Sequence, residues 1–102
     1  ILGERYELSL VFTGNTISQK LNRRYKKKNA PANVLSFSLA PRAGELFINI
    51  AHAKIEARAH KESLHNRTGF LLIHGLLHLK GYAHSSTMSR EEVKMRTKFN
   101  IH

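Results

Sequence analysis

Three histidines in one short apolar segment are the residues of this chain best suited to chemistry. His74 and His78 stand four residues apart, so on a helix both side chains project from one face, one turn apart. Gly81 follows, and a glycine at this place can end the helix and turn the chain back. Without that turn, His84 would lie roughly 9 Å beyond His78, at about 1.5 Å rise per residue.

This spacing predicts a metal site. Nitrogens that share one zinc at about 2.0–2.1 Å each are only a few ångströms apart, which the turn at Gly81 allows. The alternative is an ordinary core histidine, but burying three polar rings beside leucines costs free energy unless each nitrogen has a partner. We therefore predict one Zn²⁺ per chain on His74, His78 and His84, with a fourth position open as in hydrolytic sites.

The same histidine spacing occurs in metzincin proteases, which carry a glutamate beside the first histidine as general base. This chain has Gly75 there, so a metalloprotease is disfavoured. Because a glycine inside a helix costs about 1 kcal/mol relative to alanine, Gly75 indicates either tight helix packing or access to the metal. The histidines at 52, 60 and 65 lie in more polar stretches, and we expect them to be exposed.

The charge of the chain indicates a polyanionic partner. Seventeen lysines and arginines stand against seven acids, a formal net charge of +10, which favours RNA or DNA. An acidic membrane surface is the competing partner, but no amphipathic helix with a strong aromatic face is evident. One basic cluster could be a solvated helix end or a phosphate-binding site. Beside a metal site and with this net charge, phosphate binding is favoured. The cluster comprises Lys20, Arg23, Arg24, Lys26, Lys27 and Lys28.

Length and composition predict one domain over residues 1–102, with 41% hydrophobic residues. The chain begins at Ile1 rather than methionine, so we expect that N-terminal residues are lacking, and nothing there has the pattern of a signal peptide. The longest uncharged apolar stretch, 69–79, is too short to span a bilayer. Absence of cysteine excludes disulfides and thiolate metal sites and indicates a reducing, cytoplasmic setting.

Apolar periodicity and turn residues predict an order β-α-β-β-α-α-α. Apolar and polar residues alternate in the first part of the first strand, so one face of this strand should be covered by the rest of the protein. The helix around the histidines, capped by Asn66 or Thr68, is apolar nearly all round and should be buried. The expected strands cover 6–13, 34–39 and 45–50, and the expected helices cover 15–25, 51–61, 68–79 and a short segment from Ser89 as a cap.

These elements predict an α+β fold: a small mixed sheet of three to four strands packed with four to five helices. The metal site should lie on a buried helix and on the turn after it.

Three segments resemble the YbeY family of bacterial endoribonucleases and rRNA maturation factors. They are His74-Gly-Leu-Leu-His-Leu-Lys-Gly-Tyr-Ala-His84, Leu21-Asn-Arg-Arg-Tyr25 and Asn33-Val-Leu-Ser-Phe37. The resemblance implies a metal-dependent endoribonuclease, selective for single-stranded RNA, that acts in 16S rRNA processing and ribosome quality control. It also implies an α+β fold in which the three histidines bind zinc. The implied partners are rRNA and the small ribosomal subunit, and the oligomeric state is left open.

Some positions depart from the pattern of that family. Lys26 falls where the family usually has an arginine that helps catalysis, and lysine keeps the charge but loses the two-pronged phosphate geometry. Ala83 stands where the family typically has aspartate, a natural partner for a metal-ligating histidine. Asn29 and Ala32 replace the common Asp and Thr, and Glu45 replaces Asp.

These departures leave two interpretations. In the first, Lys26 is the catalytic residue, Glu45 is an acidic contributor, and the general base is not identified. The basic neighbours would hold the phosphodiester: Arg23, Arg24, Lys27 and Lys28. In the second, the chain is a catalytically weakened RNA- or ribosome-binding module whose metal is structural.

Metal analysis of the purified protein tests the histidine assignment. We expect about one zinc per chain, because the three imidazoles complete a zinc site. The zinc should be lost on the substitution His78→Ala, measured by elemental analysis of the dialysed proteins. A well-folded chain that contains no metal and still binds RNA would contradict the assignment.

Overall fold

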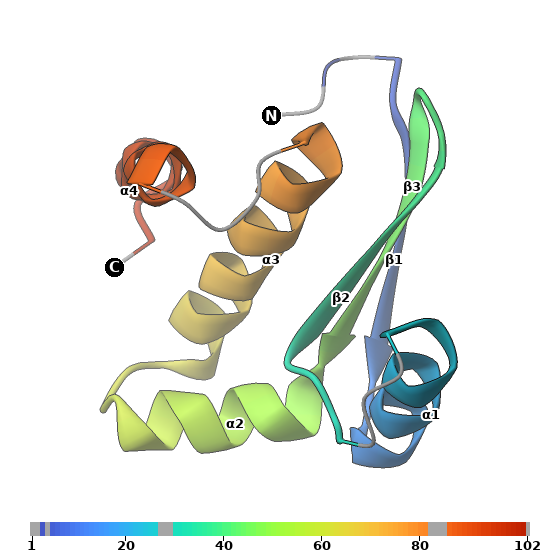
Figure 1. Ribbon diagram of the computed structural model, residues 1–102. Helices are drawn as coiled ribbons and strands as arrows, with labels where there is room; N and C mark the ends of the chain where they lie inside the picture. Colours follow the sequence, from blue (N-terminus) through green and yellow to red (C-terminus); the bar gives the residue numbers. More distant parts are fainter. Residues whose placement is uncertain (1–2, 4, 27–29, 82–85, 102) are drawn as a thin grey trace.

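The structure, a computed structural model, describes residues 3, 5–26, 30–81 and 86–101 (Figure 1). Side chains at positions 26 and 86 lie outside this description. The order of the elements confirms the predicted β-α-β-β-α-α-α. They are β1 (Glu7–Thr13), α1 (Asn15–Lys26), β2 (Val34–Ala40), β3 (Ala43–Asn49), α2 (Ile50–Ala59), α3 (Leu64–Lys80) and α4 (Ser86–Lys98).

The sheet is mixed, with strand order β1-β3-β2. β1 pairs in parallel with β3, and β2 pairs with β3 in the antiparallel direction. Helices α2 and α3 lie on one side of the sheet, and α1 lies on the other side near the end of β1 (Figure 1). This arrangement confirms the α+β class, and the described residues form three strands and four helices, within the predicted range.

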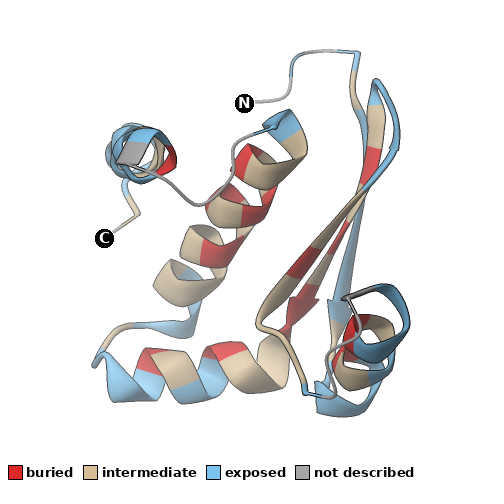
Figure 2. Ribbon diagram, viewed as in Figure 1, coloured by how far each residue is buried: buried red, intermediate tan, exposed pale blue. Residues whose placement is uncertain are grey.

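The core lies between α3 and the central strand. Leu46 and Ile48 of β3 are fully shielded from solvent, and Leu71 of α3 is 1% exposed. Figure 2 shows that buried residues lie on α3 and on the strands beside it. A second cluster joins α3 to α4, because Ile73 and Leu77 pack with the buried Met88. Helix α3 therefore holds the sheet and α4 together.

Gly75 marks the closest approach of α3 to the sheet. A Cβ atom at this position would overlap the side chain of Leu46 and would lie 3.2 Å from Val34 Cγ2 and 3.3 Å from Ser36 Oγ. The hydroxyl of Ser36 also donates a hydrogen bond to the carbonyl oxygen of Gly75, at 3.1 Å. Of the two explanations for this glycine, tight helix packing is the one that the structure supports.

The prediction of one covered face for the first strand was wrong. Every residue of β1 except Thr13 is exposed, and Leu10 and Phe12 expose 39% and 54% of their surface. These two residues pair with the buried Leu46 and Ile48. However, β1 is an edge strand, and α3 packs on the other two strands, β2 and β3. Position in the sheet, which alternation does not reveal, decides the exposure.

The predicted starts of two helices were also wrong. Ser63, rather than Asn66 or Thr68, caps α3, because its Oγ accepts a hydrogen bond from the backbone N–H of Asn66 at 3.0 Å. Helix α4 begins at Ser86, so Ser89 lies inside the helix. Helix α3 is half-buried rather than buried all round, since α2, α4 and the sheet cover only part of it.

Glu62 anchors the start of α3. Its carboxylate accepts hydrogen bonds from Asn66 Nδ2, at 2.7 Å, and from Arg67 Nε. Burial raises the pKa of this carboxyl, but the hydrogen bonds and the charge of Arg67 outweigh it, so the pKa lies below the ordinary value. The carboxylate therefore stays charged and ties the first turn of the helix.

The helices of the described part of the chain include none that is both long and apolar enough to cross a membrane.

The substitution Gly75→Ala tests the contact between α3 and the sheet. Overpacking a well-packed core costs roughly 1–3 kcal/mol, and Leu46 has no room to move because it is fully buried. Alanine gains about 1 kcal/mol of helix propensity over glycine. We expect a net loss of up to about 2 kcal/mol in the free energy of unfolding, measured by urea denaturation.

Gly14→Ala is the matched control. No atom lies within 4 Å of a Cβ built at Gly14, so this variant should keep the stability of the parent within about 0.5 kcal/mol. Equal stability of the two variants would contradict the packing role of Gly75.

Candidate metal centre and groove

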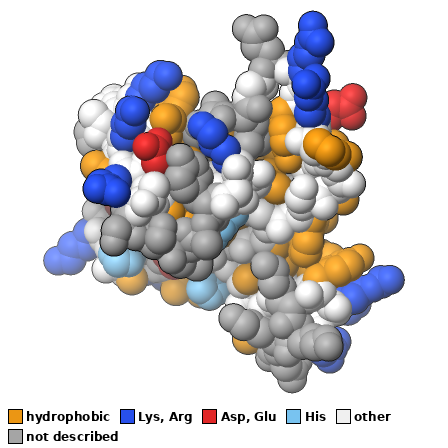
Figure 3. Space-filling model, turned by 45° about the horizontal axis from the view of Figure 1, so that its top comes forward, with side chains coloured by type: hydrophobic (Ala, Val, Ile, Leu, Met, Phe, Trp, Pro, Cys, Tyr) orange, Lys and Arg blue, Asp and Glu red, His pale blue; other side chains and the backbone are white. Residues whose placement is uncertain are grey.

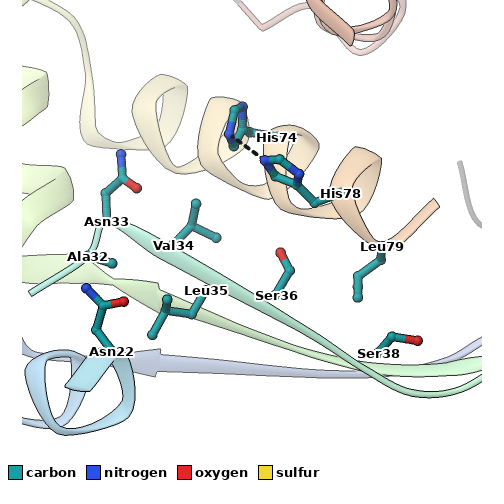
Figure 4. Close-up of a pocket in the computed structure, with 10 residues that line it drawn as sticks. All are labelled: Asn22, Ala32, Asn33, Val34, Leu35, Ser36, Ser38, His74, His78 and Leu79. Carbon is teal, nitrogen blue, oxygen red and sulfur yellow. Dashed lines mark hydrogen bonds between the residues drawn. The ribbon is translucent and has the colours of Figure 1, made fainter. Parts of the chain in front are cut away.

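His74 and His78 converge on one point from consecutive turns of α3. Their Nε2 atoms are 3.1 Å apart, and their rings meet edge to face, with centroids 4.7 Å apart and planes at 78°. Figure 4 shows both rings projecting from α3 above the first residues of β2. The prediction that the two imidazoles share one face of a helix is confirmed.

The third predicted ligand, His84, lies outside the described residues, as does Ala83. The turn that should bring it back begins as expected, since Gly81 ends α3 in the left-handed region with φ of 111°. Among the residues that the structure describes, no group of three or more His, Cys, Asp or Glu side chains could hold a metal. The three-histidine site therefore stays a prediction.

The two described imidazoles fit a zinc ion. Two nitrogens 3.1 Å apart can both reach one zinc at about 2.0–2.1 Å, the usual zinc–nitrogen distance. Imidazole is also a ligand that zinc accepts readily. His74 and His78 therefore supply two of the donors that such an ion needs.

Glu92 of α4 is a residue of this site that the sequence analysis missed. Its Oε2 lies 2.7 Å from Nδ1 of His74, on the side of the ring away from His78. The sequence analysis predicted a short helix from Ser89 and did not single out Glu92. The 18 residues that separate it from His74 leave no periodic signal, because the contact depends on how α4 packs against α3.

A groove of about 750 Å³ opens beside the two histidines. Its other described lining residues come from α1, from the segment before β2, from β2 itself and from the end of α3 (Figure 4). They are neutral: Asn22, Ala32, Asn33, Val34, Leu35, Ser36, Ser38 and Leu79. The described lining therefore offers amide and hydroxyl groups around the histidines, and none of these neighbouring side chains carries a formal charge.

Two buried polar residues of α1 hold the wall of this groove. Ser18, 2% exposed, donates to the carbonyl oxygen of Ala32 at 2.8 Å and accepts from the N–H of Ala32 at 2.9 Å. Asn22 Nδ2 donates to the carbonyl oxygen of Ala30 at 2.8 Å. The sequence analysis predicted this helix but did not single out these two residues.

Asn33 continues the wall. Its Nδ2 lies 3.3 Å from Glu56 Oε2, and its carbonyl oxygen accepts from the N–H of Asn49 at 2.9 Å. The sequence analysis named Asn33 only as the first residue of a resembling segment.

The predicted basic cluster is described only in part. Lys20, Arg23 and Arg24 are exposed on α1, and the guanidinium of Arg24 lies 5.5 Å from the ring centre of Tyr25. Lys26 is the last residue of α1, and its side chain, like Lys27 and Lys28 as a whole, lies outside the described residues. Figure 3 shows Lys and Arg side chains scattered over a face on which histidines are visible.

Two cationic side chains near the histidines were not singled out by the sequence. The guanidinium groups of Arg67 and Arg96 lie 4.8 and 4.9 Å from the ring centre of Phe70. Phe70 in turn stacks on His74, with centroids 6.1 Å apart. Two guanidinium groups, Arg96 of α4 and the Glu62-paired Arg67 of α3, therefore lie one ring away from the candidate metal centre.

Two predicted side-chain positions were wrong. Glu45, expected as an acidic contributor, instead lines a separate groove of about 310 Å³ with Tyr25, Phe37 and Phe47. Its neighbour Leu46 faces α3, and successive residues of a strand point to opposite faces of the sheet. His52, expected to be exposed, is partly buried, and its Nδ1 is shielded from solvent without a hydrogen-bond partner among the described residues.

Comparisons with known proteins agree on one family. A family model described as Endoribonuclease YbeY matches residues 2–101. The Endoribonuclease YbeY of Onion yellows phytoplasma is 39% identical over 90 residues, which are 79% of this chain and 62% of that protein. The protein of the same name from Halalkalibacterium halodurans is 35% identical over 107 residues, covering 89% of this chain and 67% of the relative.

The fold is similar to that of a solved structure. The solution structure of a protein from Thermotoga maritima matches with a TM-score of 0.63 and 23% identity, and the match covers 87% of this chain and 65% of that one. The chain spans 62% of the length of the phytoplasma relative.

The substitution Ser18→Ala tests the wall of the groove. It leaves both backbone groups of Ala32 without their partner, which costs about 1–3 kcal/mol for buried groups. We expect that loss in the free energy of unfolding, with faster amide hydrogen exchange at Ala30, Ala32 and Asn33. The control Ser9→Ala, at an exposed position of β1, should change neither the stability nor the exchange rates. Unchanged stability and exchange in Ser18→Ala would show that Ser18 does not hold the segment before β2 in place.

Proposed function

The chain belongs to the YbeY endoribonuclease family, and from this premise we propose that it is a zinc-dependent endoribonuclease that cleaves single-stranded RNA. One observation carries the proposal: the Nε2 atoms of His74 and His78 meet 3.1 Å apart at the side of a groove about 750 Å³ in volume. Cavities of roughly 300–1,000 Å³ are typical of small-molecule sites, so one unstacked nucleotide fits.

His74 and His78 would hold the zinc, with His84 as the third ligand predicted from the sequence. When bound, zinc supplies Lewis-acid chemistry for hydrolysis and lowers the pKa of water toward about 7. The proposed tasks of the chain's own residues are to orient the two rings and to seat the RNA beside them.

The lining of the groove favours the sugar and base of the substrate over its phosphates. Asn22, Asn33, Ser36 and Ser38 offer neutral hydrogen-bonding groups, which suit the 2′-hydroxyl and the base edges of an unpaired nucleotide. The phosphates would meet cations outside the groove. Arg23 and Arg24 on the exposed side of α1, with Lys26, Lys27 and Lys28, are the proposed phosphate contacts, and Lys26 is the proposed catalytic one.

The proposed setting is 16S rRNA maturation and ribosome quality control on the small ribosomal subunit, in the cytoplasm. The formal net charge of +10 supports an RNA partner, since basic proteins are attracted to polyanions. The curated relatives that carry the name Endoribonuclease YbeY support the nuclease assignment.

One observation favours a second candidate, an RNA-binding module with a structural metal. Among the described residues that line the groove, none is a carboxylate that could act as a general base. The nearby carboxylate of Glu92 is instead hydrogen-bonded to His74 on the far side of the ring.

Cleavage of single-stranded RNA by the zinc-loaded protein separates the two candidates. The double substitution His74→Ala/His78→Ala should slow cleavage at least about 100-fold, because a catalytic metal contributes several kcal/mol to transition-state stabilisation. The measurement is the rate of appearance of RNA fragments on a denaturing gel.

The exposed histidines provide the matched control, His60→Ala/His65→Ala, which should cleave at the rate of the parent. Equal RNA decay in the parent and in the His74/His78 variant would rule out catalysis at this site. RNA binding that weakens steeply with salt, without any cleavage, would establish the binding module instead.

A further inference from the structure

We propose that Glu92 is a positioning residue that holds His74 in the tautomer required for binding a metal ion. The inference deepens the proposed function, on which it rests for the identity of the metal. It assigns to α4 a direct part in the site, although the candidate metal ligands come from α3 and from the turn after it.

The contact between Glu92 and His74 is short and partly shielded. Oε2 of Glu92 lies 2.7 Å from Nδ1 of His74, and the two side chains expose only 16% and 20% of their surface. A charged acceptor in such surroundings makes a stronger hydrogen bond than a neutral one. The carboxylate therefore has a defined effect on the ring.

That effect is to place the proton of the imidazole. An ionised carboxylate only accepts hydrogen bonds, so Nδ1 of His74 must be the N–H donor. In the neutral ring, Nε2 then carries the lone pair. Nε2 is the atom that meets Nε2 of His78 at 3.1 Å, so the lone pair of His74 is directed to the point where the two rings converge.

The two histidines consequently play different parts before a metal binds. Since Nε2 of His74 is an acceptor, Nε2 of His78 must donate the hydrogen bond between them. His78 therefore has to move its proton from Nε2 to Nδ1 before it can ligate through Nε2, whereas His74 is already prepared. A carboxylate behind a metal-ligating histidine is known to fix ring orientation and tautomer in this way.

Packing holds the carboxylate in place. Met88, one helical turn before Glu92, is 2% exposed and packs against Ile73 and Leu77 on either side of His74 in the sequence. Residues four apart lie on the same face of a helix, so burial of Met88 turns Glu92 toward α3. Val93, the next residue, is 61% exposed, so the chain already turns away from α3 one residue after Glu92.

The sequence makes this contact more important. The alanine at position 83 removes the acid that the family resemblance places next to His84. Among the described residues, Glu92 is the carboxylate within hydrogen-bonding distance of a site histidine.

The test compares Glu92→Ala and Glu92→Gln with Glu91→Ala, a neighbouring acid whose loss changes the net charge equally. The first measurement is zinc affinity, by competition with a chromophoric chelator. Losing such a partner typically weakens metal binding 10–100-fold, so we expect that loss for Glu92→Ala. Glu91→Ala should stay within about twofold, and Glu92→Gln should be intermediate because its amide oxygen still accepts from Nδ1–H.

The second measurement is the position of the ring protons in the metal-free proteins. Long-range ¹H–¹⁵N correlation spectra, recorded where the histidines are neutral, should show the proton of His74 on Nδ1 in the parent and in Glu92→Gln. In Glu92→Ala they should show a mixture of tautomers. A purely structural role of Glu92 would change stability without changing this pattern, and thermal unfolding of each variant separates the two effects.

A proton on Nε2 of His74 in the parent would overturn the proposal, as would equal zinc affinity of Glu92→Ala and Glu91→Ala. Neither measurement uses RNA. Normal zinc binding with Nδ1 protonation and no RNA cleavage would therefore reject the nuclease and keep the role of Glu92. If the parent bound no zinc, the role of Glu92 in metal binding would be rejected, whatever the ring-proton pattern.

Discussion

Helix α3 lies against the sheet at Gly75, where the missing side chain leaves room for Leu46 and Ser36 to meet the helix backbone. This contact sets the height of the helix above β2 and β3. His74 precedes Gly75 and His78 follows one turn later, so both rings are held at the same edge of the sheet. The groove between these rings and the start of β2 exists because the helix cannot move away from the strands without opening the core at Leu46 and Ile48, which are fully buried.

The opposite wall of the groove is built by polar side chains. Ser18 and Asn22 of α1 are 2% and 6% exposed. Both side chains hydrogen-bond to the backbone of the segment that leads into β2. Buried polar groups need partners, and here the pairing of both residues fixes a loop that has no regular structure of its own. The exposed basic residues of α1 lie outside this wall. Hydrogen bonding by these two residues thus shapes the wall of the groove.

Helix α4 contributes to the site as well as helix α3. The imidazoles of His74 and His78, both on α3, converge. Glu92, on α4, contacts the ring of His74. Two helices joined through the cluster of Ile73, Leu77 and Met88 therefore serve one site. This apolar packing holds α4 against α3 and so keeps Glu92 next to the imidazole of His74.

Local spacing in the sequence was sufficient to predict the order of the elements, the shared face of His74 and His78, and the helix end at Gly81, because each depends on residues within a few positions. It did not reveal that β1 is an exposed edge, that Glu45 faces away from the histidines, or that Glu92 contacts His74. Those features depend on which segments pack together over long separations. Such contacts leave no periodic pattern in the chain, and only the tertiary structure decides them.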